Sequence, residues 1–247
     1  MKPDIVKPDW PAPANVQAFA TTRLGGVSQG AYASFNLGAH VGDESSAVNA
    51  NRERLRQAFK LPTEPCWLTQ VHGVRVVEAN AENTGAEADV AFVRSAGTVC
   101  AILTADCVPI LFCNRAGTEI AAAHGGWRGL ASGVIQTTVA ALTSPPNELM
   151  AWLGPAISAK NYRVGEEVHA AISNCIADLD SVLEPFGTDQ WNADLYGLAR
   201  QILRGLGVTA VFGGYYCTYA RQDLFYSFRR DGVTGRMASV IWLTEPT

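Results

Sequence analysis

Short apolar runs alternate with polar or glycine-rich breaks along most of the chain. Runs of this kind, rich in Val, Ile, Phe and Ala and bounded by Gly, Pro, Asn or Asp, are typical of β-strands. The pattern predicts strands at residues 16–22, 89–93, 99–103, 108–113, 119–123, 149–153, 208–212 and 238–243. It also predicts a hairpin in which strands 66–71 and 74–79 pair around His72 and Gly73.

Apolar residues at helical spacing predict helices at residues 43–59, 129–142, 166–177 and 194–206. Asp43 is expected to cap the first of these helices. Strands outnumber helices, and several strands are joined by short turns. The sequence therefore predicts one α/β (α+β) domain over residues 1–247, with mixed β-sheets layered with helices rather than a doubly wound parallel sheet.

Composition narrows the class of protein. The chain has 247 residues, of which 48% are hydrophobic and 17% charged, and this balance favours a large buried core over disorder. A net charge of −4 without a basic run argues against nucleic-acid binding. No apolar run approaches the roughly 18 residues of a membrane span, and no secretion signal is apparent near the N-terminus. The 6 cysteines lack CxxC spacing, so we expect reduced thiols and a cytoplasmic protein.

Candidate chemistry lies at the breaks between the central strands. Cys107 precedes strand 108–113, His124 follows strand 119–123, and His72 lies in the turn of the predicted hairpin. Two imidazoles and a thiolate suit Zn²⁺, and three protein ligands leave a fourth position open, as in catalytic zinc sites. The spacing matches no short zinc motif. A buried cysteine with two histidines that bond to the backbone fits the spacing equally well.

The other histidines and the arginines give weaker signals. His169, in a predicted helix, is expected to be structural, and His40 lies in an irregular loop that could face the site. Arg52 belongs to a helix with further arginines, most of which are expected to solvate its surface.

The three candidate ligands lie in the motifs TQVHG (69–73), TADCVP (104–109) and AHGGWRG (123–129). Further motifs are TRLGGVS (22–28), NLG (36–38), NR (51–52), WLGPAI (152–157), CTY (217–219) and FRRD (228–231). Together they resemble the YfiH family, whose members are also described as laccase-domain proteins, purine nucleoside phosphorylases or peptidoglycan editing factors. The resemblance covers nearly the whole chain. One departure is Gly125, where the family usually has alanine; its loss of a methyl group is expected to loosen the turn.

The resemblance implies a single-domain layered α/β fold, unlike the cupredoxin fold of true laccases. It also implies that His72, Cys107 and His124 bind one metal ion, usually Zn²⁺ and in some preparations Cu²⁺. The implied activity is phosphorolysis of adenosine, inosine, guanosine and methylthioadenosine, with adenosine deamination as a second activity. Polyphenol oxidation and removal of L-serine from peptidoglycan precursors are the alternatives. The expected partners are a purine nucleoside and phosphate, without nucleic acid or membrane, and the expected state is a monomer or small homo-oligomer.

Physical reasoning ranks these activities. A multicopper oxidase holds its coppers mostly with imidazoles, and 4 histidines cannot supply enough of them. Zinc has no redox chemistry and indicates a Lewis-acid or activated-water role. Asp106 is a further catalytic candidate beside the three ligands. The candidates for substrate binding are Arg23, Asn36, Arg52 and Gln70. Two other possibilities stay open, a metal-free Cys107–His124 pair that cleaves an amide and a non-catalytic protein stabilised by zinc.

Overall fold

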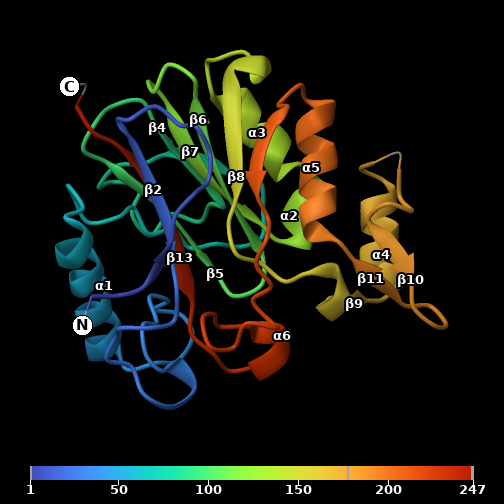
Figure 1. Ribbon diagram of the computed structural model, residues 1–247, viewed down its shortest axis with the longest axis horizontal. Helices are drawn as coiled ribbons and strands as arrows, with labels where there is room; N and C mark the ends of the chain where they lie inside the picture. The colour runs from blue at the N-terminus through green and yellow to red at the C-terminus, as the bar shows by residue number, and fades with distance from the viewer. Residues whose placement is uncertain (1, 177, 246–247) are drawn as a thin grey trace.

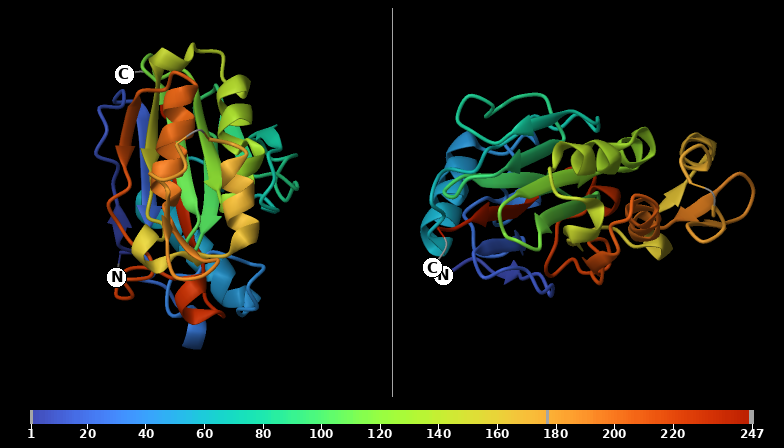
Figure 2. Two further views of the ribbon diagram at one scale, coloured as in Figure 1. Left: turned by 90° about the vertical axis from the view of Figure 1, so that its right-hand side faces the viewer. Right: turned by 90° about the horizontal axis from the view of Figure 1, so that it is seen from above.

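Two β-sheets pack face to face in the centre of the molecule, with helices on the outer face of each (Figures 1 and 2). The coordinates are a computed structural model that describes residues 2–176 and 178–245. The smaller central sheet has the antiparallel order β1 (Ile5–Val6), β2 (Val16–Thr21), β13 (Met237–Leu243), β5 (Val99–Thr104). The larger has the order β12 (Ala210–Gly213), β8 (Leu149–Leu153), β6 (Val108–Asn114), β7 (Ile120–Gly125), β4 (Val90–Val93), β3 (Val76–Glu78). Its outer pairs β12–β8 and β3–β4 are parallel and its inner pairs antiparallel, so this sheet is mixed.

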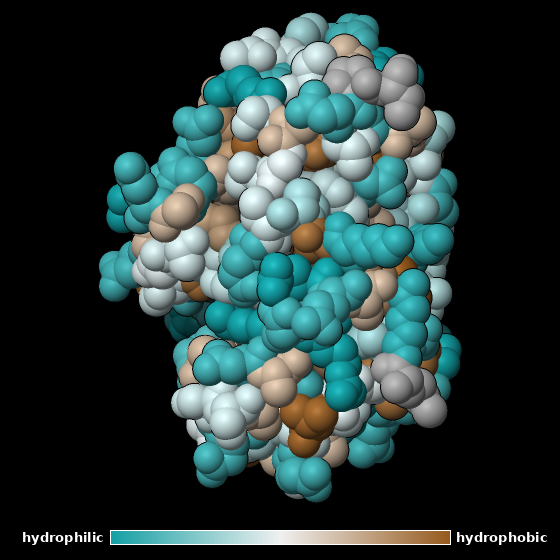
Figure 3. Space-filling view, turned by 90° about the vertical axis from the view of Figure 1, so that its left-hand side faces the viewer, coloured by the Kyte–Doolittle hydropathy of each residue, from teal (hydrophilic) through white to brown (hydrophobic). Residues whose placement is uncertain are grey.

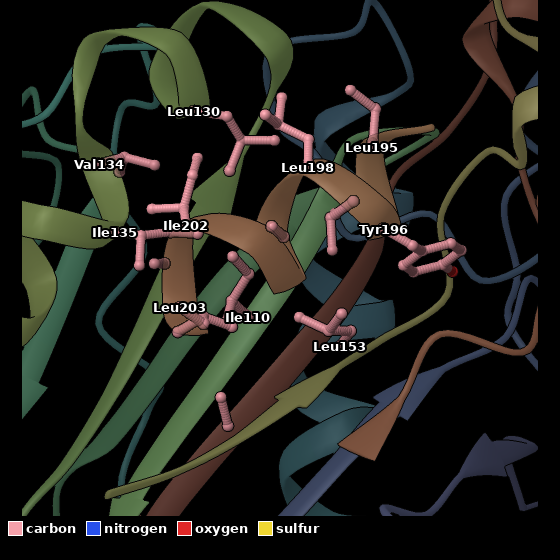
Figure 4. Packing of buried hydrophobic residues seen from close by; sticks show 14 of the residues in the cluster. Ile110, Leu130, Val134, Ile135, Leu153, Leu195, Tyr196, Leu198, Ile202 and Leu203 are labelled. Atoms are coloured by element: carbon pink, nitrogen blue, oxygen red, sulfur yellow. The ribbon is translucent and has the colours of Figure 1, made fainter. Parts of the chain in front are cut away.

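The central strands are buried on both faces, and their side chains alternate between two cores. In β6, Ile110 and Phe112 pack with the helices, whereas Leu111 and Cys113 pack between the sheets. The helical layer on this side comprises α2 (Trp127–Ser132), α3 (Val134–Ala141) and α5 (Leu195–Gly205). Figure 4 shows the apolar side chains of α5 meeting those of the sheet and of α2 and α3. This two-sided burial explains why the strands appear as continuous apolar runs in the sequence.

On the opposite side, α1 (Ser45–Phe59) covers the smaller sheet through Leu55, which packs with Phe19 and Trp242. The surface on this side of the molecule is mostly hydrophilic, with scattered apolar side chains (Figure 3). The two central sheets and their outer helices thus form one four-layered α/β domain, as the sequence predicts.

A small lobe projects from one side of this sandwich (Figure 1). It contains α4 (Glu166–Ser173) and the antiparallel strands β9 (Arg163–Val164), β10 (Leu183–Pro185) and β11 (Trp191–Ala193). The remaining elements are α6 (Phe228–Asp231) and short 3₁₀ turns at Gly30–Tyr32, Pro146–Glu148 and Ala159–Asn161. The sequence did not predict the lobe strands, because each is too short to show a periodic pattern. None of the helices in the described residues has the length and hydropathy to cross a membrane.

Several predicted boundaries are wrong. The helix predicted at 129–142 is two helices, divided at Gly133, whose φ of +100° ends the first. Asp43 does not cap α1, because its carboxylate accepts hydrogen bonds from Ser28, Asn36 and the Glu44 N–H, and the helix begins at Ser45. The helix predicted at 166–177 ends at Ser173, and residue 177 lies outside the described residues.

The predicted hairpin at 66–79 is also wrong. Only β3 forms there, and it pairs with β4 in a parallel register rather than with an adjacent strand. The turn residue His72 has a φ of +60°, and the N–H groups around it bond to a side chain rather than to a partner strand. That side chain, Asp89, belongs to the site described next.

Candidate metal centre

Three sulfur and nitrogen donors from separate segments meet at one point. His72 lies in the loop before β3, Cys107 between β5 and β6, and His124 near the end of β7. Their ligand atoms all lie within 4.8 Å of one another. The Cys107 Sγ is 3.8 Å from His72 Nε2, and the two imidazole ring centroids are 4.6 Å apart. The structure thus brings together the three residues that the sequence singled out.

A fully buried carboxylate, Asp89, holds two of the three donors in place. Its Oδ1 lies 2.8 Å from His124 Nδ1 and accepts a 2.9 Å bond from the His72 N–H. Its Oδ2 accepts bonds from the N–H groups of Val71 and Gly73, at 3.1 and 2.7 Å. Such a carboxylate fixes the tautomer and the orientation of a ligating imidazole, here leaving Nε2 of His124 free for an ion.

Sequence reasoning missed Asp89 because a single aspartate before a strand has no distinctive pattern. The available signal was its position at the start of a buried run.

Glycine is required at position 126, where the motif AHGGWRG (123–129) passes close to His72 and Cys107. A Cβ added to Gly126 would lie 2.7 Å from His72 Cδ2 and 3.2 Å from Cys107 Sγ, too close for any larger residue without displacement. Gly125, where the resemblance expects alanine, is the last residue of β7 and pairs with Val108. It is therefore part of an ordered strand and not of a loosened turn.

The charges at the centre favour a thiolate. Burial alone would raise the pKa of the Cys107 thiol, but the neighbouring imidazoles of His124 and His72 outweigh it and lower the pKa to about 6. Burial opposes the charge on His124 as well, but Cys107 and Asp89 raise its pKa. Burial also disfavours the Asp89 carboxylate, yet its bonds from His124 and Gly73 keep its pKa below the ordinary value. A thiolate is the form in which cysteine binds metals.

These donors fit a single divalent ion of the zinc or copper type. A thiolate and two imidazoles are ligands that both metals accept. The carboxylate behind His124 supplies the outer-shell bond typical of ligating histidines. His72 is exposed and Cys107 half-buried, so the group is accessible to a substrate. Among the described residues, no fourth His, Cys, Asp or Glu joins this group.

The donors open into a cavity of about 320 Å³. Its lining includes His72, Cys107, His124, His40, Gln70, Leu103, Thr104, Ala105, Arg128, Phe228 and Arg236. Among the described residues, this lining contains no aspartate or glutamate. Gln70 lies in the lining, but its amide is engaged at both ends, donating to the Leu103 C=O at 2.8 Å and accepting from the Leu103 N–H at 2.7 Å.

Other candidates from the sequence lie outside this lining. Asp106 is buried, and its carboxylate accepts bonds from Thr218 Oγ1 at 2.6 Å and the Arg229 N–H at 2.7 Å. Arg23 donates to the Ala33 C=O from two nitrogens, at 3.0 and 2.8 Å. These contacts give Asp106 and Arg23 a structural role, and their predicted functional roles stay untested.

Asn36 and Arg52 lie on the loop and helix beside the site. The side-chain Oδ1 of Asn36 accepts from the N–H groups of Gly38 and Arg236, at 2.9 and 2.8 Å, so Asn36 joins two loops. Arg52 lines an adjacent cavity rather than the one at the donors. The binding roles of both residues stay predictions.

Residues 17–244 match the family described as multi-copper polyphenol oxidoreductase laccase. The chain belongs to this family. It is 49% identical over 240 residues to the purine nucleoside phosphorylase YfiH of Escherichia coli, covering 97% of this chain and 98% of that relative. It is 50% identical over 239 residues to a purine nucleoside phosphorylase of Pseudomonas aeruginosa, covering 96% and 98%. The crystal structure of a Neisseria meningitidis protein of the family DUF152 superimposes with a TM-score of 0.93 at 51% identity, covering 97% and 99%.

Proposed function

We propose that this chain is a purine nucleoside phosphorylase that depends on a Zn²⁺ ion held by His72, Cys107 and His124. The observation that carries the proposal is an accessible three-donor group in a cavity whose lining holds arginines and no carboxylate. Such a cavity favours an anionic co-substrate. Relatives that are 49% and 50% identical over nearly their whole length are named purine nucleoside phosphorylases.

The reaction replaces the purine at C1′ of the ribose by a phosphate oxygen. The C1′–N9 bond breaks, and the purine leaves with a proton as the free base beside ribose 1-phosphate. A bound zinc ion would supply Lewis acidity. The chain orients the imidazole of His124 through Asp89, and it binds the anion with the cationic groups of the lining. Substrates of this class are adenosine, inosine, guanosine and methylthioadenosine.

We assign adenosine deamination to the same cavity as a second activity. Zinc deaminases use a glutamate as general acid and base. The absence of a carboxylate from the described lining therefore makes phosphorolysis the principal reaction. Phenol oxidation would require a copper ion in place of zinc. The described residues contain one three-donor group, which cannot form a multicopper centre.

A second candidate function is a metal-free amidase. Asp89, His124 and Cys107 form a carboxylate–imidazole–thiol series in which the thiol pKa is lowered, an arrangement that activates a nucleophilic cysteine. Removal of L-serine from peptidoglycan precursors would use such chemistry. The two candidates use the same atoms, and they differ in their response to loss of the metal.

The deciding experiment combines metal analysis with identification of products. Freshly purified protein should contain zinc, and adenosine with phosphate should yield adenine and ribose 1-phosphate. Inosine formed without phosphate would indicate deamination. Chelation should abolish phosphorolysis, and added Zn²⁺ should restore it. An amide-cleaving activity that survives chelation, with no nucleoside turnover before it, would establish the amidase instead.

Replacement of the thiolate provides a matched test. Cys107→Ala should lose zinc and nucleoside turnover while its circular dichroism spectrum stays native. Cys175→Ala serves as the control, because Cys175 is not one of the three donors and its Sγ donates to the nearby Ile172 C=O. Loss of the fold in Cys107→Ala, without any nucleoside turnover in the parent protein, would identify the ion as purely structural.

A further inference from the structure

A second cavity, of about 450 Å³, adjoins the one at the donors. The two share His40, Gln70 and Leu103 in their linings. Arginines line both cavities: Arg128, which pairs with Glu167, and Arg236 line the first, and Arg52 lines the second. Among the described residues, neither lining includes an aspartate or glutamate. The two adjoining cavities therefore have arginine side chains in their linings and no carboxylate among the described lining residues.

Arg236 is fixed by backbone contacts that leave part of its guanidinium free. Its Nη1 donates to the carbonyl oxygens of Thr234 and Gly235, both at 3.0 Å. Its Nε and Nη2 have no acceptor among residues 2–176 and 178–245. No carboxylate of those residues lies within 4.0 Å of it. The side chain is thus held rigidly while two of its donor nitrogens stay available.

Arg52 is held in the same manner. Its Nε and Nη2 donate to the Leu37 C=O at 3.0 and 2.9 Å, and its guanidinium lies 4.2 Å above the ring of Trp67. In the described part of the chain, its Nη1 has no acceptor and no carboxylate lies within 4.0 Å. Trp67 and the carbonyl therefore orient this charge, while Glu64, which accepts a hydrogen bond from Trp67 Nε1, attracts it without forming a direct ion pair.

Some of the other arginines do carry a direct counter-ion. Arg94, Arg128 and Arg230 each pair with a carboxylate, at 3.3, 3.1 and 2.7 Å. A partly buried guanidinium without a direct ion pair costs free energy. Burial lowers the pKa of both Arg52 and Arg236, and it outweighs the attraction of Glu64 for Arg52 and of Cys107 and Asp106 for Arg236. His40 lines both cavities, and burial, followed by the charges of Arg236 and Arg52, lowers its pKa. An anion from solution would supply the missing counter-charge.

We propose that His40, Arg52 and Arg236 form the subsite for a phosphate anion at the junction of the two cavities. The inference rests on the proposed phosphorylase function, for which it locates the inorganic co-substrate. The free N–H groups of Arg236 and Arg52 bind the phosphate oxygens through charge-assisted hydrogen bonds. His40, which lines both cavities, donates one further N–H. Guanidinium groups suit this role because their planar donors match phosphate geometry.

Calorimetric titration of the zinc-loaded protein with inorganic phosphate tests the subsite. The parent protein should bind phosphate, and Arg236→Gln and Arg52→Gln should each weaken binding by about 10- to 100-fold. Arg236→Lys keeps a point charge and should recover part of the affinity. Arg56→Gln is the matched control: it removes the same charge from the same helix, but Arg56 is exposed and paired with Glu53. Its phosphate affinity should stay within about twofold of the parent.

Steady-state kinetics then separate this proposal from the proposed function. The Arg236→Gln and Arg52→Gln variants should raise the KM for phosphate while changing the KM for the nucleoside little. Phosphate affinity that is unchanged in both variants, or undetectable in the parent protein, would overturn the subsite. Arginine-dependent phosphate binding in a protein that turns over no nucleoside would overturn the phosphorylase assignment and leave the subsite standing. Native circular dichroism spectra of each variant exclude unfolding as the cause.

Discussion

Buried carboxylates lie beside the two ends of strand β7, where each accepts hydrogen bonds from a loop, but with different consequences. Before the strand, Glu119 accepts bonds from the N–H groups of Thr143 and Ser144, at 2.9 and 2.7 Å, and pairs with Arg94. Beside the far end, Asp89 accepts from a loop in the same manner. All the partners of Glu119 serve the fold. Asp89 additionally bonds the ring of His124, and one of the loop amides that it binds belongs to His72.

This comparison shows how a structural carboxylate becomes a positioning residue. The two carboxylates differ only in which side chains lie on the loop that each one bonds. The loop that bonds to Glu119 connects two elements. The loop that bonds to Asp89 also presents the imidazole of His72 to the thiolate of Cys107. The local energetics are alike, so the two carboxylates can be separated by what their loss does to the metal centre.

The largest difference is expected from Asp89→Asn. The amide cannot accept from all the loop N–H groups and His124 Nδ1 at once, so both imidazoles lose their fixed orientation. We expect metal affinity and nucleoside turnover to fall by about 10- to 100-fold, the usual effect of removing an outer-shell carboxylate. Titration with a competing zinc chelator measures the first and kcat/KM the second. Metal affinity equal to that of the parent protein would show that Asp89 serves the fold alone.

A smaller effect is expected from Gly126→Ala, which leaves both carboxylates in place. The added Cβ would lie 2.7 Å from His72 Cδ2, so the imidazole must move. A displacement of this kind should weaken metal binding by about tenfold. Gly205→Ala is the control, because a Cβ there meets no atom within 4 Å. If both alanine variants bind zinc as the parent does, the close packing at Gly126 is irrelevant to the centre.

The smallest effect on activity is expected from Glu119→Gln, which should change stability instead. Loss of the charged acceptor should lower the free energy of unfolding by about 1–3 kcal/mol while zinc affinity and turnover stay near the parent values. Burial opposes ionisation of Glu119, but the bonds from Ser144 and Thr143 outweigh it and lower its pKa.

The stabilisation by Glu119 is therefore fully present above its unfolded-state pKa, about 4.3, and is lost as pH falls through the lower native pKa. Urea unfolding at a series of pH values should show the parent and Glu119→Gln converging in acid. A constant difference at all pH values would contradict this origin of the stability.

The sequence predicted the strands well and the connections between them poorly. Runs such as 99–103, 108–113 and 149–153 are buried on both faces, and their composition therefore identifies them. The loop around His72 could not be predicted from local pattern, because the aspartate that shapes it is distant in the chain. For the same reason the sequence identified the donors but not the carboxylate that orients them.

The substrate residues were the least predictable. Arg23 and Arg52 look equivalent as isolated arginines in glycine-rich or helical surroundings. In the structure, two nitrogens of each bond to a single backbone carbonyl. Arg52 also lines the cavity that adjoins the metal centre, and this feature depends on tertiary contacts. The sequence did not identify Arg236 as a binding residue, because its free donor nitrogens depend on which groups surround it in the folded chain.

The three donors reach their meeting point from segments that no short stretch of chain contains, so the unfolded polypeptide has no equivalent of this pocket for an ion. A bound ion would therefore stabilise only the native state. At a metal concentration one hundred times the dissociation constant, it would raise the free energy of unfolding by about 2.7 kcal/mol. For that reason, protein kept in chelating buffers would unfold at a lower temperature, whether or not the ion takes part in catalysis. Melting curves with and without added zinc thus belong beside every activity assay.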